Sequence, residues 1–174
     1  MTKMTTLLYG LGAYTRGMIF VKAIPAPEPR SVAVKWGAWV YAAVLVAMIL
    51  SQLFAFEKFI PLIEAYRLPG GEGIAALVAS IIVILEVFSL PYLLRMPLSP
   101  LARLCSMVGS VVVPFVWLLL GIGAFALGLT NAGIFGPKVD VSAAMQTVFA
   151  ILLGGLSVWV AWGLFFVGRH QSPK

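Results

Sequence analysis

Four apolar runs, each long enough to cross a membrane, constrain this chain more than any other feature. They cover roughly residues 36–56, 74–94, 104–129 and 141–167. A helix needs about 20 residues to cross a hydrocarbon core of about 30 Å, and each run reaches that length. Charged residues make up 10% of the 174 residues, against about 25% in soluble domains. The sequence therefore predicts an all-α membrane protein, a bundle of four transmembrane helices.

The first 33 residues are the least membrane-like part of the chain. Residues 7–21 are apolar but contain Arg16, and a central Arg costs about 2.5–3.5 kcal/mol on insertion scales. We expect an amphipathic helix that lies on the membrane interface, and a fifth, poor span is the alternative. The proline-rich stretch 25–30 then breaks the helix. The expected organisation is an interfacial segment 1–33, a transmembrane domain 34–168 and a tail 169–174.

The basic residues fall unevenly on the two sides of the predicted spans. Nine of the twelve belong to one side, namely Lys3, Arg16, Lys22, Arg30, Lys35, Arg95, Arg103, Arg169 and Lys174. Cytoplasmic segments collect Lys and Arg, so both termini are expected in the cytoplasm, at the inner membrane of a bacterium. The net charge of +6 is thus interpreted as topology. No basic run with interleaved aromatic residues is present, and nucleic-acid binding is not expected.

Glu86 is the first candidate for chemistry, because it is the only acidic residue well inside a predicted span. A carboxylate in lipid is costly, so it faces protein or water, finds a partner or stays protonated. It could carry a proton or bind a ligand, or it could make a structural hydrogen bond between helices. Ser89 shares its helix face. Together with Gln52, near the end of the first span, these side chains could line one polar pocket.

Three basic side chains beside the spans each have two possible roles. Lys58 follows the first span and could cap a site for a quinone-like headgroup, or its side chain could extend to the interface. Arg95 and Arg103 flank the short second connection and are expected to contact lipid headgroups or to set topology. His170 and Cys105 are the only residues of their kinds. We therefore expect no metal site and no covalently bound cofactor.

The middle of the chain carries a family resemblance. The stretch FAFEKFIPLIEAYRLPGG, followed by ILEVFSLPYLLRM, resembles the DoxX/MauE superfamily of small four-helix membrane proteins, including its DoxD-like members. In that group the first span ends in a Lys and a Phe, a Leu-Pro follows, and the second span carries a Glu. Here these features fall on Lys58, Phe59, Leu68-Pro69 and Glu86, within a region of resemblance that covers about residues 36–125.

The resemblance implies a bundle associated with redox systems. We expect a membrane subunit or assembly factor of a redox complex, with other membrane or redox subunits and lipids as partners. A quinone is the candidate ligand, near Gln52, Lys58 and Glu86. The alternatives are a structural or scaffolding subunit and, third, a small-molecule or proton transporter. No nucleophile–base pair is evident, so the isolated chain is not expected to be an enzyme.

Overall fold

The computed structural model describes residues 23–129, 131, 133–136, 139 and 141–165. Five helices make up this part of the chain: α2 Val32–Leu53, α3 Phe56–Glu64, α4 Gly71–Leu93, α5 Pro100–Leu127 and α6 Ala143–Phe165. All but the short α3 are long and apolar enough to cross a membrane. The predicted four-helix membrane bundle is confirmed. The predicted interfacial helix 7–21 and the tail 169–174 lie outside the described residues.

Local capping decides where the spanning helices begin. Ser31 caps α2 by accepting a hydrogen bond from the backbone N–H of Val34, so the helix starts at Val32 and not near residue 36. Ser99 accepts from the N–H of Ala102 in the same way, and α5 begins at Pro100 and not near residue 104. A capping side chain accepts a hydrogen bond from a backbone N–H group that would otherwise be unpaired, and hydropathy alone does not show where such caps lie.

The first transmembrane segment is interrupted. The backbone leaves helical geometry at Ala55 (φ −141°, ψ 42°) and resumes as α3 at Phe56. Residues 56–64 therefore form a separate helix and not an extension of α2. It buries Phe59 and Ile63 and packs beside α4, whereas Lys58 is exposed.

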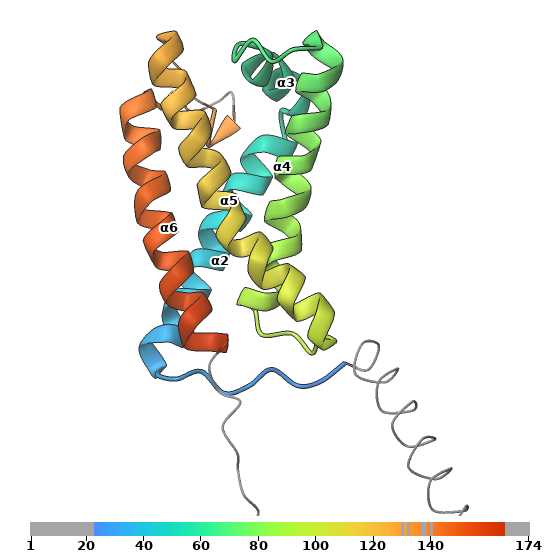
Figure 1. Ribbon diagram of the computed structural model, residues 1–174, viewed down its shortest axis with the longest axis vertical. Helices are drawn as coiled ribbons and strands as arrows, with labels where there is room; N and C mark the ends of the chain where they lie inside the picture. The colour runs from blue at the N-terminus through green and yellow to red at the C-terminus, as the bar shows by residue number, and fades with distance from the viewer. Residues whose placement is uncertain (1–22, 130, 132, 137–138, 140, 166–174) are drawn as a thin grey trace, which may run out of the picture.

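The helices pack as a closed bundle in which α5 lies against both α4 and α6, and α2 also lies against both (Figure 1). Close approach depends on small residues. A Cβ added at Gly121 of α5 would lie 2.7 Å from the Thr147 hydroxyl oxygen of α6. Large apolar side chains such as Leu77, Phe115 and Leu152 face outward and are exposed. Outward apolar faces on four long helices are those of an integral membrane protein.

The two ends of the bundle differ in construction (Figure 1). At one end lie α3, the start of α4 and the end of α5. At the other end, an extended segment of residues 23–31 crosses the bundle before α2 begins. We call residues 23–31 the strap. The connection 94–99 between α4 and α5 lies at the same end, which we call the arginine end after Arg95 and Arg103.

Candidate functional site

Glu86 lies at the centre of a hydrogen-bonded cluster inside the bundle. It is on α4 and is completely buried. Its Oε1 accepts a hydrogen bond from Gln52 Nε2 of α2 at 3.2 Å and from Trp117 Nε1 of α5 at 2.8 Å. Of the alternatives open to a carboxyl group inside a span, Glu86 has polar partners, and they lie on two other helices.

The fourth spanning helix joins through Gln146 of α6. Its Nε2 donates to the backbone carbonyl oxygen of Trp117 at 3.3 Å. One side chain from each spanning helix therefore takes part, and we call Gln52, Glu86, Trp117 and Gln146 the polar chain. All four side chains have no solvent exposure. Polar bonds between helices in a membrane contribute about 0.6–2 kcal/mol each, so this chain fixes the register of the bundle.

The interruption of the first segment brings Gln52 to Glu86. Gln52 is one residue from the end of α2, but Glu86 lies well inside α4. The end of α2 is thus level with the interior of α4, and α3 occupies the space beside the first part of α4. Discontinuous helices in membrane proteins commonly border buried polar sites, because their ends leave backbone groups to be satisfied.

A glycine turn covers the end of α2. Gly136 has a φ of +69°, and a Cβ there would lie 2.8 Å from the Ser51 carbonyl oxygen. This close approach places the backbone carbonyl of Ile134, which is also buried, 3.3 Å from Gln52 Nε2. The connection between α5 and α6 thereby closes the polar chain from one side.

The polar chain has more acceptors than donors. Gln52 Nε2 is turned toward two acceptor oxygens, and Gln146 Nε2 is turned toward the Trp117 carbonyl oxygen, with Tyr66 as a second side-chain partner of Gln146. Among the described residues, the buried oxygens Gln52 Oε1, Glu86 Oε2 and Gln146 Oε1 have no hydrogen-bond partner. Buried polar atoms are nearly always paired. A proton on the carboxyl group or a donor group of a ligand would supply what is missing.

Tyr66 extends the polar cluster toward the connection between α3 and α4. It shares a side-chain hydrogen bond with Gln146, which lowers the pKa of its hydroxyl, but burial has the larger effect and raises that pKa to about 12. The hydroxyl therefore stays neutral at physiological pH and remains able to donate. Phe59 of α3 packs beside the same cluster, with its ring centroid 6.4 Å from that of Trp117.

The other residues singled out from sequence are placed apart from the polar chain. The Ser89 hydroxyl donates to the Leu85 carbonyl oxygen of its own helix at 2.7 Å and faces Gly109 of α5. Lys58 is exposed on α3. Arg95 and Arg103 lie at the arginine end, where both donate to backbone carbonyls of the strap. The structure thus joins Gln52 to Glu86 but not Ser89 or Lys58.

Sequence reasoning did not single out Trp117 and Gln146. Gln146 was detectable in principle, because a glutamine inside an apolar run is costly and points to a partner. Trp117 gave no such signal, since an indole in a span usually reads as apolar packing. In the described part of the chain, no group of three His, Cys, Asp or Glu side chains is placed to hold a metal ion.

The fold and the site define a four-helix integral membrane protein with a buried carboxyl group hydrogen-bonded to its neighbours. Comparison with protein-family models, with curated proteins and with solved structures finds no match for this chain. The resemblance to the DoxX/MauE superfamily stays a prediction.

Proposed function

We propose that this chain is a membrane subunit or assembly factor of a redox complex, and that its polar chain holds the headgroup of a quinol. The observation that carries the proposal is the excess of acceptors around Glu86. Three buried oxygens there lack donors. The reduced form of a quinone has two hydroxyl donors, whereas the oxidised form has only carbonyl acceptors. The polar chain therefore suits the reduced form.

The surroundings are also suited to such a ligand. A cofactor site is mostly apolar with a few convergent polar groups, and Phe59 and Trp117 provide aromatic surface beside the carboxyl group. The isoprenoid tail would lie along the outward apolar faces of the helices. Because the polar chain is closed, entry requires the turn 133–136 to give up the contact between the Ile134 carbonyl and Gln52.

Binding of a short-chain benzoquinol and of the matching benzoquinone to the purified protein tests this proposal. We expect the quinol to bind about tenfold more tightly, because a buried acceptor left without a donor costs about 1–3 kcal/mol. Glu86→Leu should abolish the preference for the quinol. Glu57→Gln is the matched control, since Glu57 is exposed on α3. Equal affinity for the two forms, or no binding of either, would contradict the proposal.

A second candidate is a structural subunit, and the complete burial of the polar chain favours it. One side chain from each spanning helix joins in this closed cluster, which is how a bundle is held in a single register. Ligand binding by Glu86→Gln, measured on protein recovered from membranes with its native partners, separates the two functions. A quinol role predicts that Glu86→Gln keeps the partners but changes ligand binding, and a structural role predicts that neither changes.

A further inference from the structure

The strap is fixed across the arginine end by hydrogen bonds at both of its ends. The backbone N–H of Ile24 donates to the Leu98 carbonyl oxygen at 3.0 Å, and the N–H of Arg30 donates to the Gly163 carbonyl oxygen at 3.1 Å. The Arg30 guanidinium also lies 5.5 Å from the ring centroid of Trp162. The strap thereby connects the α4–α5 connection to the end of α6.

Two arginines hold the middle of the strap. Arg95 Nη2 donates to the Pro27 carbonyl oxygen at 3.0 Å. Arg103 Nη2 donates to the carbonyl oxygens of Ile24 and Pro25 at 2.7 and 3.1 Å. Proline has no N–H and cannot continue a helix, so the carbonyls of an extended proline-rich segment are free to accept these bonds.

These bonds use part of the guanidinium groups and leave their charge unbalanced. A guanidinium has five N–H donors, and the strap takes bonds from the Nη2 atom of each arginine. Within the residues that the structure describes, neither arginine has a carboxylate partner, and the buried Arg95 Nε has no acceptor. Both side chains are only partly exposed. Partly buried charges of this kind are normally paired.

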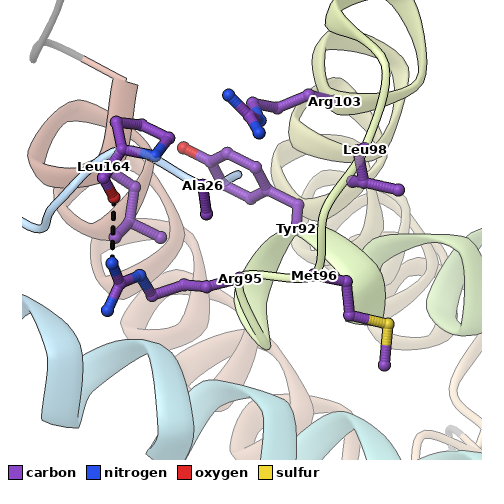
Figure 2. A pocket seen from close by; sticks show the side chains of 8 residues that line it. Ala26, Tyr92, Arg95, Met96, Leu98, Arg103 and Leu164 are labelled. Atoms are coloured by element: carbon purple, nitrogen blue, oxygen red, sulfur yellow. Dashed lines mark hydrogen bonds between the residues drawn. The ribbon is translucent and has the colours of Figure 1, made fainter. Parts of the chain in front are cut away.

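A small cavity lies between the strap and these arginines (Figure 2). Its lining includes Tyr92, Arg95 and Arg103, and its volume is about 10 Å³. Such a volume holds about one water-sized atom. The Tyr92 hydroxyl donates to the Ala161 carbonyl oxygen at 3.1 Å, which secures one wall of the cavity to α6. The space therefore fits a single oxygen atom of a larger group that stays outside.

We propose that Arg95 and Arg103 bind a phosphate group at the arginine end, with one phosphate oxygen in the cavity under the strap. Arginine pairs with phosphate through two parallel N–H···O bonds, and its flat donor arrangement matches this geometry. The site lies where α4 ends and α5 begins, at the boundary between hydrocarbon and water. Its two sources are the headgroup of an anionic phospholipid and free phosphate. The bound anion balances both arginines and keeps the strap docked.

Lipid retention by the full-length protein tests this site. We would incubate the detergent-solubilised protein with phosphatidylglycerol, or with a phosphate-free neutral galactolipid, and count bound lipids by native mass spectrometry. Phosphatidylglycerol should bind, and Arg95→Gln and Arg103→Gln should each weaken its binding about tenfold, as expected for loss of a charged hydrogen-bonding group. Arg67→Gln is the matched control, because Arg67 is exposed in the connection between α3 and α4, and α3 lies at the other end of the bundle.

Inorganic phosphate provides the second arm. If inorganic phosphate displaces phosphatidylglycerol, and both arginine substitutions weaken phosphate binding to the same extent, the site takes free phosphate. That result supports the proposed phosphate site. Retention of phosphatidylglycerol that is equal in Arg95→Gln, Arg103→Gln and Arg67→Gln overturns the proposal, as does equal retention of the galactolipid. Arg103→Lys keeps the charge but loses the paired donors. It should show an intermediate loss, and it replaces Arg103→Gln if that variant does not fold.

Discussion

The polar chain and the arginine end solve the same problem, the pairing of polar groups in a mostly apolar bundle, in opposite ways. In the polar chain, Glu86 accepts hydrogen bonds from two side chains, Gln146 donates to a buried backbone carbonyl, and all four side chains are buried. At the arginine end, charged donors bond to backbone carbonyls of the strap and remain partly exposed. Inside the bundle, where water is absent, each polar group needs a protein partner, whereas an arginine at the boundary between hydrocarbon and water can also bond to water.

This comparison predicts that substitutions in the polar chain cost more than substitutions at the arginine end. The largest effect is expected for Glu86→Ala, which leaves Gln52 Nε2 without one acceptor and Trp117 Nε1 without its acceptor. Each buried group left unpaired costs about 1–3 kcal/mol, so the free energy of unfolding in detergent should fall by about 2–4 kcal/mol. Glu86→Gln keeps an acceptor oxygen and should lose much less. Equal losses of unfolding free energy for the two variants would show that the acceptor oxygen of Glu86 does not stabilise the polar chain.

Trp117→Phe comes next in size. The substitution removes the N–H that bonds Glu86 but keeps a ring beside Phe59. We expect a loss of about 1–2 kcal/mol, measured by the same unfolding assay. The control is Trp162→Phe on the outward face of α6, where the ring is 57% exposed and the loss should be small. A larger loss of stability for Trp162→Phe than for Trp117→Phe would contradict the prediction that the buried, hydrogen-bonded indole contributes more.

Arg103→Gln should cost about 1 kcal/mol or less, because water replaces the lost donor at a partly exposed position. Its more visible effect is expected on the strap, whose carbonyls at Ile24 and Pro25 lose their partner. Amide hydrogen exchange at Ile24, whose N–H bonds Leu98, should become faster in this variant. Unchanged exchange would show that the strap does not depend on the arginine.

A separate effect, confined to alkaline solution, is expected from the titration of Tyr66. Burial raises its pKa to about 12, whereas the ordinary value is about 10. The folded state therefore holds this proton more strongly than the unfolded state, and stability should fall as the pH rises from about 10 to about 12. Tyr66→Phe should reduce that loss in thermal unfolding measured at both pH values. If the variant and the parent lose the same stability over this pH range, the loss belongs to other titrating groups.

The sequence predicted the class of fold and singled out the residue at the centre of the polar chain for the same physical reason. Lipid excludes charge, so apolar runs marked the spans and a lone acid inside one marked Glu86. The pairing with Gln52 was also within reach, because both are polar residues inside spans. Ser89 and Lys58 were grouped with them from helix spacing and from nearness in the chain. The structure instead bonds Ser89 to its own helix and leaves Lys58 exposed on α3.

The hydrogen-bond partners of Trp117 and Gln146 could not be assigned from sequence, because they depend on the rotation and depth of each helix. The sequence also did not show how deep in the bundle the first spanning helix ends. The interruption at Ala55 ends α2 beside the interior of α4, and it falls in the apolar stretch 53–56, where hydropathy gives no sign of a break. Likewise the strap was expected only as a helix break, and its bonds to Arg95 and Arg103 join segments about 70 or more residues apart.

The sequence by itself determined that the chain has four membrane-spanning helices and one carboxyl group inside them, since hydrocarbon acts on each residue separately. The tertiary structure alone decided which donors meet that carboxyl group and which carbonyls meet the two arginines. Those pairings depend on how far one helix slides and turns against the next, and close contacts such as Gly121 against Thr147 set that position.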